Sequence, residues 1–156
     1  MTDYTNGYFG RMYDTIAAYR FEKRIREAEK QKLMKANNWD AVKAWNEHEE
    51  TEHAFPYSNG RMNAFFAWQR SQANSSSIFE ASDLPWEEDA HDFVETLKEA
   101  GITEFAITDA STALMKILHA LDKEGCQMVR LCKVSRTENR YGETKTEEYN
   151  GILMRI

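Results

Sequence analysis

The sequence has little of what marks a secreted or membrane-spanning protein. Its 156 residues contain no apolar run near the roughly 18 residues that a bilayer-spanning helix needs. The first residues, "MTDYTNGYFGRMYD", lack the basic segment followed by an apolar run that a signal peptide would have. We therefore expect a cytoplasmic protein that does not associate with membranes.

Cysteine is also scarce, and the two cysteines predict neither a disulfide nor a metal site. Cys126 and Cys132 lie six residues apart in a segment with the composition of a strand, so both should project from one face of that strand. Side chains placed in this way cannot easily form a disulfide bond. Two thiols without a nearby histidine do not make a zinc site. Free thiols favour a reducing cytosol.

The motifs of common enzymes are absent, including a glycine-rich phosphate loop and a Gly-x-Ser-x-Gly nucleophile turn. The segment "ITDASTA" does place Asp109, Ser111 and Thr112 between a predicted strand and a predicted helix, where α/β proteins often bind ligands. Asp and Ser are also the residues that helix capping selects. We favour capping by Asp109 or Ser111. A small enzyme with a pocket near Asp109–Thr112 is an alternative.

Histidine and glutamate gather in "NEHEETEH", residues 46–53, which invites a metal-site interpretation. His48 and His53 are five residues apart, about 140° around a helix, so we expect their rings to point apart. Two Glu-x-x-His units of the kind that di-iron proteins use are formed by Glu50 with His53 and by Glu88 with His91. In a chain with 18 glutamates, two such units among four histidines are only mildly surprising. We predict no metal and no cofactor, and keep these two units as a remote metal-site alternative.

Charge is unevenly distributed in this chain, whose formal net charge is −6. Residues 20–35 carry seven Lys or Arg against three Glu, and residues 54–110 are acidic. Arg20, Lys23 and Arg24 are therefore candidate contacts to nucleic acid. Together with Arg26 these residues do not all share one face of a helix, and no known nucleic-acid-binding motif accompanies them. We favour a solvated helix, with weak nucleic-acid binding through residues 20–35 as an alternative.

Apolar spacing predicts an N-terminal helical hairpin. From Phe9 to about Ala36 a stripe recurs at intervals of three and four residues, and we expect it to be buried; its members are Tyr13, Ala17, Phe21, Ile25 and Ala28. Asn37 or Asn38 can cap the next helix, which runs to His53. After the turn-rich "FPYSNG" we expect a compact unit over residues 54–156, with the hairpin of residues 1–53 packed on it in one structural domain. A hairpin that extends from this unit, with a hinge near residues 55–60, is the alternative.

Residues 54–156 predict the order α-α-β-α-β-β, which gives an α+β or α/β fold with a small three-stranded sheet. The helix over residues 82–101 has Pro85 in its first turn and Gly101 at its end. A strand over 102–111 and a helix ending at Gly125 follow. The last two strands should form a hairpin around "TENRYG".

The stretches "HAFPYSNGRMNAFFAWQRSQ" and "FEASDLPWEEDAHDFVETLKEAGITEFAITDASTALMKILHALDKEGCQM" resemble a bacterial protein family of unknown function. Its members are small cytosolic proteins, often carried on integrative elements, plasmids or phages of gut Gram-positive bacteria. The resemblance covers residues 53–156 and implies a mobile-element setting. It brings no assigned catalytic residues.

Together these features favour a non-enzymatic accessory or regulatory protein that binds another protein. Four tryptophans, Trp86 among them, and seven tyrosines supply the large rings that protein interfaces use. In a mobile-element setting the partner could be a host defence nuclease that the protein inhibits, a replication or transfer protein, or a second copy of the chain. We expect an exposed apolar patch at the binding surface.

Overall fold

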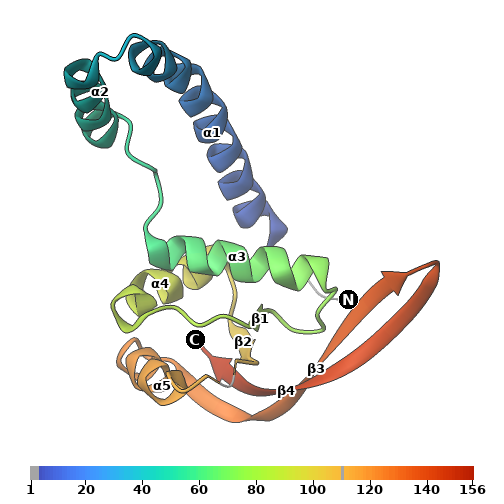
Figure 1. The fold of residues 1–156 in the computed structure, drawn as a ribbon. Coiled ribbons are helices and arrows are strands. Elements are labelled where there is room, and N and C mark those ends of the chain that lie inside the picture. Colours follow the sequence, from blue (N-terminus) through green and yellow to red (C-terminus); the bar gives the residue numbers. More distant parts are fainter. Residues whose placement is uncertain (1–3, 110) are drawn as a thin grey trace. The chain divides into compact units, whose positions relative to one another are not determined.

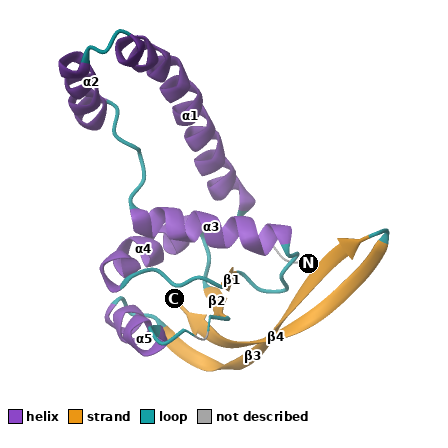
Figure 2. Cartoon of the chain, in the orientation of Figure 1, coloured by secondary structure: helices purple, strands orange, loops and turns teal. Residues whose placement is uncertain are grey.

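The structure is a computed structural model that describes residues 4–109 and 111–156 (Figures 1 and 2). Within these residues the helices are α1 (Asn6–Lys35), α2 (Trp39–Glu52), α3 (Asn59–Ala73), the 3₁₀ helix η1 (Glu87–Asp89), α4 (Ala90–Ala100) and α5 (Leu114–Lys123). The strands are β1 (Glu80–Ala81), β2 (Glu104–Ile107), β3 (Gln127–Arg140) and β4 (Glu143–Arg155). This content confirms the α+β class.

The chain divides into two compact units. The sheet unit comprises the start of α1 up to Phe9 together with Tyr57–Ile156, and the hairpin unit comprises Gly10–Pro56. None of the described helices combines the length and the apolar character needed to cross a bilayer.

Polar contacts join the two helices of the hairpin unit. The Arg26 guanidinium forms an ion pair of 2.7 Å with the Glu49 carboxylate, which is itself buried. The Lys30 ammonium lies 5.2 Å from the centre of the Trp45 ring. As predicted, an asparagine caps α2: the Asn38 Oδ1 accepts a hydrogen bond of 3.3 Å from the backbone N–H of Ala41. An ion pair and a cation–π contact therefore help to join α1 and α2.

The apolar stripe of α1 does not make these contacts, so its predicted burial is wrong. Phe21 is 64% exposed and Ile25 is 61% exposed, and Ala17 and Ala28 are also exposed. Side chains on the opposite side of α1, about 140–180° from Phe21, make the contacts with α2 instead. The ion pair and the cation–π contact determine which side of α1 faces α2. A prediction from hydrophobic periodicity alone takes no account of such contacts.

The predicted separation of the His48 and His53 rings is also wrong. Their centroids lie 5.7 Å apart, with the ring planes at 80°. Helix α2 ends at Glu52, and His53 has the non-helical backbone angles φ −131° and ψ 41°. Counting 100° per residue no longer applies beyond the last helical residue, so the His53 ring can turn back toward His48.

The sheet has four described strands in the order β1-β2-β4-β3. Strand β1 pairs in parallel with β2, and the other pairs are antiparallel. The predicted hairpin of the last two strands is confirmed, with positive φ angles at Tyr141 and Gly142 in its two-residue turn. The predicted sheet lacked β1, because two residues are too few to show a strand period. Strands β3 and β4 continue as a long ribbon past β1 and β2 (Figure 1).

Aromatic packing closes the core of the sheet unit. Phe9, at the start of α1, stacks on Trp68 of α3 at 5.5 Å and on Phe79 at 5.9 Å. Phe93 of α4 meets Phe105 of β2 edge to face at 5.8 Å. Gly101 ends α4 in the left-handed conformation, as predicted.

The two cysteines do not share one uninterrupted strand face as expected. Cys126 precedes β3, and a register shift between Met128 and Arg130 separates it from Cys132. Both thiols are free and buried, and burial raises the pKa of each. Burial makes both thiols poor nucleophiles at neutral pH.

Candidate functional site

Two pockets flank α5 in the sheet unit. The first, the Trp86 groove, has a volume of about 350 Å³. It is lined by Pro85, Trp86, Glu87, Glu88, Thr112, Ala113, Lys116 and Ile117. The groove therefore brings together Trp86 and Thr112, two of the residues that the sequence suggested for binding.

Local backbone structure holds Trp86 at the surface. Pro85 is buried, and the chain then passes through Trp86 in an extended conformation into η1. The Trp86 carbonyl accepts a hydrogen bond of 2.9 Å from the Asp89 N–H, which closes this turn. The Trp86 side chain is 74% exposed. A large aromatic side chain left in water beside a groove is a typical feature of a binding surface.

Asp109 and Ser111 do not cap α5, so the capping prediction is wrong. The helix begins at Leu114, with Ala113 at the cap position and no side-chain cap hydrogen bond. Asp109 instead accepts a hydrogen bond of 2.7 Å at Oδ1 from the Ser111 N–H, which forms a local turn. Among the described residues that line the Trp86 groove, Thr112 is the one member of the predicted set from this segment, and Ala110 lies outside the described residues.

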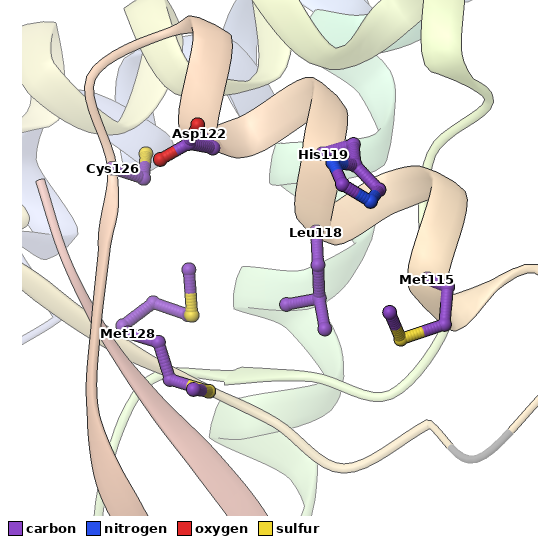
Figure 3. Close-up of a pocket in the computed structure, with 7 residues that line it drawn as sticks. Met115, Leu118, His119, Asp122, Cys126 and Met128 are labelled. Carbon is purple, nitrogen blue, oxygen red and sulfur yellow. The ribbon is translucent and has the colours of Figure 1, made fainter.

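The second pocket, the methionine pocket, has a volume of about 260 Å³ and lies on another side of α5 (Figure 3). Its lining residues are Met115, Leu118, His119, Asp122, Cys126, Met128 and Met154. Figure 3 shows Leu118 extending from α5 toward the space that Met128 borders from β3. Met115 and Met128 are each 64% exposed, whereas Met154 is buried. Unbranched methionine side chains adapt their shape to a partner, and protein-binding surfaces use them for this reason.

We call the Trp86 groove and the methionine pocket together the α5 surface. Its rim carries more negative than positive charge, because Glu87, Glu88 and Asp122 line it against Lys116. A partner surface with apolar side chains and excess positive charge would complement it.

The two Glu-x-x-His units lie in different surroundings. Glu50 and His53 line a pocket of about 270 Å³ in the hairpin unit. His91 lies 2.7 Å from Glu124 through Nδ1, and this hydrogen bond raises the His91 pKa, while Glu88 lines the Trp86 groove. Over residues 4–109 and 111–156, no group of three or more His, Cys, Asp or Glu side chains is placed to hold a metal ion.

The basic residues of α1 do not gather into one surface. Arg20 and Arg24 are exposed, while Lys23 lines the pocket beside Glu49 and Glu50. Arg26 pairs with Glu49, and this hydrogen bond lowers the Glu49 pKa. Part of the positive charge is thus neutralised inside the hairpin unit and is not directed outward as a phosphate-binding surface would require.

Sequence reasoning missed the most buried charged group in the sheet unit, Glu80. Its side chain is 2% exposed and accepts hydrogen bonds from Ser76 at 2.8 Å and Thr108 at 2.7 Å, besides pairing with Arg136. Because its described partners satisfy both carboxylate oxygens, we interpret Glu80 as a structural residue rather than a reactive one. Glu80 is the first residue of the two-residue strand β1, and so short a segment gives no sequence signal for such a role.

Residues 63–156 match the profile of a domain family described as "Domain of unknown function (DUF7698)". Searches of curated proteins and of solved structures each returned no match. The matched segment contains the whole α5 surface and the four strands. It covers more than half of the chain, and the chain therefore belongs to this uncharacterised family.

Proposed function

We propose that this protein is a non-enzymatic accessory or regulatory protein whose α5 surface binds another protein. The observation that carries the proposal is the 74% exposure of the Trp86 side chain beside a groove of about 350 Å³. Tryptophan is enriched among the residues that contribute most to interface energies, because it buries a large area on a rigid side chain.

The chemistry of the lining residues supports binding more than catalysis. The described residues that line the Trp86 groove include no histidine or cysteine, and in the methionine pocket the Cys126 thiol is buried, which raises its pKa and makes it a poor nucleophile. The neighbouring methionine pocket adds exposed apolar area from Met115 and Met128. A partner helix or loop that buries both regions would remove the two most exposed apolar parts of this surface from water.

We further propose that the protein acts in the cytoplasm of a bacterium, as part of a mobile element or phage. The sequence resemblance over residues 53–156 motivates this setting, and the free, buried cysteines fit a reducing compartment. A host defence nuclease is the partner class that suits the charge. Nucleases bind DNA phosphates with Lys and Arg, and the acidic rim formed by Glu87 and Glu88 complements such a surface.

Photo-crosslinking in the native host tests this proposal. A photo-reactive phenylalanine analogue replaces Trp86, and in a separate variant it replaces Tyr141, which is fully exposed in the β3–β4 turn. We expect one predominant cross-linked protein from position 86 and none in common from position 141. Identification by mass spectrometry then shows whether that protein is a nuclease.

Capture of the cross-linked protein by alanine variants distinguishes specific binding from chance labelling. Trp86→Ala should abolish capture of the same protein, and Tyr141→Ala should retain it. Equal cross-linking from both positions, or equal capture by both alanine variants, would show that the Trp86 groove is not the binding site.

A further inference from the structure

The hairpin unit exposes an apolar row on the side of α1 that faces away from α2. We call it the α1 row; its members are Ala18, Phe21, Ile25 and Ala28. All four are exposed, and Phe21 and Ile25 are more than 60% exposed. Angles of 100° per residue place them within about 80° of one another around the helix, opposite the contacts with Glu49 and Trp45. The row is therefore accessible while the hairpin stays closed.

The spacing of the α1 row is that of a coiled coil. Intervals of three, four and three residues match alternating d and a positions, with Phe21 and Ala28 at d and Ala18 and Ile25 at a. Ile25 supplies a β-branched residue at a, one of the two features of two-stranded parallel coils, while Phe21 and Ala28 occupy the d positions where such coils have Leu. Asp14 and Lys32 occupy the next positions at either end, so the apolar contact is limited to about three turns.

The charges beside the row identify the partner. In a parallel pair, a residue at g faces the e residue of the following heptad on the other helix. Arg24 lies at g and Glu29 at e, and both are exposed. Two copies of α1 in parallel thus place each Arg24 opposite the Glu29 of the other copy. In an antiparallel pair, e faces e, and Glu22 and Glu29 would meet like charges.

We propose that α1 pairs in parallel with the α1 of a second copy of this chain, and that the α1 row forms the seam of this dimer. This inference stands apart from the proposed function, because it rests on the hairpin unit and not on the α5 surface. Because the seam is short, we expect a weak dimer that dissociates at low protein concentration.

Sedimentation equilibrium of the full chain tests the proposal, over a range of roughly 5 to 500 µM. We expect a monomer–dimer equilibrium for the unaltered protein. Arg24→Glu and Glu29→Arg should each raise the dissociation constant by about tenfold, since each replaces two attractive pairs with two repulsive ones. The double variant should restore the original dissociation constant. Lys43→Glu on α2 is the control. It changes the net charge as much as Arg24→Glu does and should leave the dissociation constant unchanged.

Direction and seam need separate measurements. Phe21→Glu should abolish the dimer, with an unchanged circular dichroism spectrum showing that the chain stays folded. Ala28→Cys should form a disulfide-linked dimer under mild oxidation, because a parallel coil places position 28 beside its own copy. A protein that stays monomeric over the whole range, or a double variant as weak as the single ones, would overturn the proposal. So would a dimer that Ala28→Cys cannot cross-link.

Discussion

The Glu80 carboxylate and the Arg136 guanidinium form a buried ion pair between residues 56 positions apart. The Arg136 side chain is held from its other side as well, since its guanidinium carbon lies 3.8 Å from the centre of the Tyr149 ring. Strand β1, which begins at Glu80, is thereby joined to the β3–β4 ribbon, and the Ser77 N–H in the preceding loop adds a hydrogen bond of 2.9 Å to the Ser135 carbonyl. This pair fixes one side of the sheet unit.

Breaking that pair from one side should be costly. Arg136→Met leaves the 2% exposed Glu80 carboxylate without its counter-charge, and we expect a loss of about 3–5 kcal/mol in the free energy of unfolding. Urea unfolding at pH 7 measures it. Arg140→Met is the matched control: the Arg140–Glu138 pair is exposed, so its loss should cost about 1 kcal/mol or less. Equal losses in both variants would mean that the Glu80 pair is solvated.

The contact between α1, α3 and α4 should make stability depend on pH at both extremes. Arg61 forms an ion pair of 2.8 Å with Glu99, and the Tyr8 hydroxyl donates a hydrogen bond of 2.7 Å to the same carboxylate. The hydrogen bonds from Arg61 and Tyr8 lower the Glu99 pKa from 4.5 to about 2. Burial and the Glu99 contact raise the Tyr8 pKa from 10.0 to about 12.

The signs of these two contributions are opposite. The lowered Glu99 pKa stabilises the fold above pH 4.5, and this contribution is lost as the pH falls toward 2. The raised Tyr8 pKa stabilises the fold below pH 10 and is lost as the pH rises toward 12. We expect the stability difference between the unaltered protein and Glu99→Gln to shrink over the acid window. The difference for Tyr8→Phe should shrink over the alkaline one. Urea midpoints across pH measure both, and differences that stay flat would contradict the pKa shifts.

Local rules in the sequence predicted the elements that they control directly. Asn38 caps α2, Gly101 ends α4, and the last two strands pair as a hairpin. Each of these depends on residues within a few positions of one another, so the signal is present in a short segment.

Features that depend on distant partners were missed. The periodicity of α1 shows that an apolar stripe exists, but not whether another element buries it. Here the pairing of Arg26 with Glu49 turns the other side of α1 toward α2, so the stripe stays exposed. Strand β1 forms because its backbone pairs with that of β2. Glu80 can be buried because it pairs with Arg136 of β3, which lies 56 residues later in the chain. For the candidate site, the sequence named Trp86 and Thr112 separately. Only the fold shows that both line one groove.

A close approach between α3 and α4 gives a prediction at Gly60. A Cβ atom there would lie 2.3 Å from the Asp89 carbonyl oxygen and 3.0 Å from the Phe93 backbone nitrogen. The obstacles are largely backbone, so Gly60→Ala should push the helices apart and cost about 1–3 kcal/mol of unfolding free energy. Gly10→Ala is the control: it lies in α1 with nothing within 4 Å of its added Cβ. The free energy of unfolding of this control should rise by about 0.5–1 kcal/mol, because Ala is more stable than Gly inside a helix. Thermal unfolding of both variants decides, and a stabilised Gly60→Ala would contradict this helix contact.

Methionine oxidation gives a prediction for the α5 surface. Met115 and Met128 are each 64% exposed, whereas Met154, which lines the same pocket, is 2% exposed. Dilute hydrogen peroxide should therefore convert Met115 and Met128 to sulfoxides well before Met154, because the oxidant must reach the sulfur. Peptide mass spectrometry over time measures the three rates. Comparable oxidation rates for Met154 and Met128 would mean that the Met154 sulfur is accessible to the oxidant and not buried.

The same oxidation should weaken partner binding if the α5 surface is the binding site. A sulfoxide turns an adaptable apolar side chain into a polar one, so cross-linking from position 86 should fall as Met115 and Met128 oxidise. A variant that combines Met115→Leu with Met128→Leu keeps the apolar area and cannot be oxidised at these positions. Cross-linking by this variant should survive peroxide treatment. If it falls as much as in the unaltered protein, the loss arises from another residue, and the methionine pocket takes no part in binding.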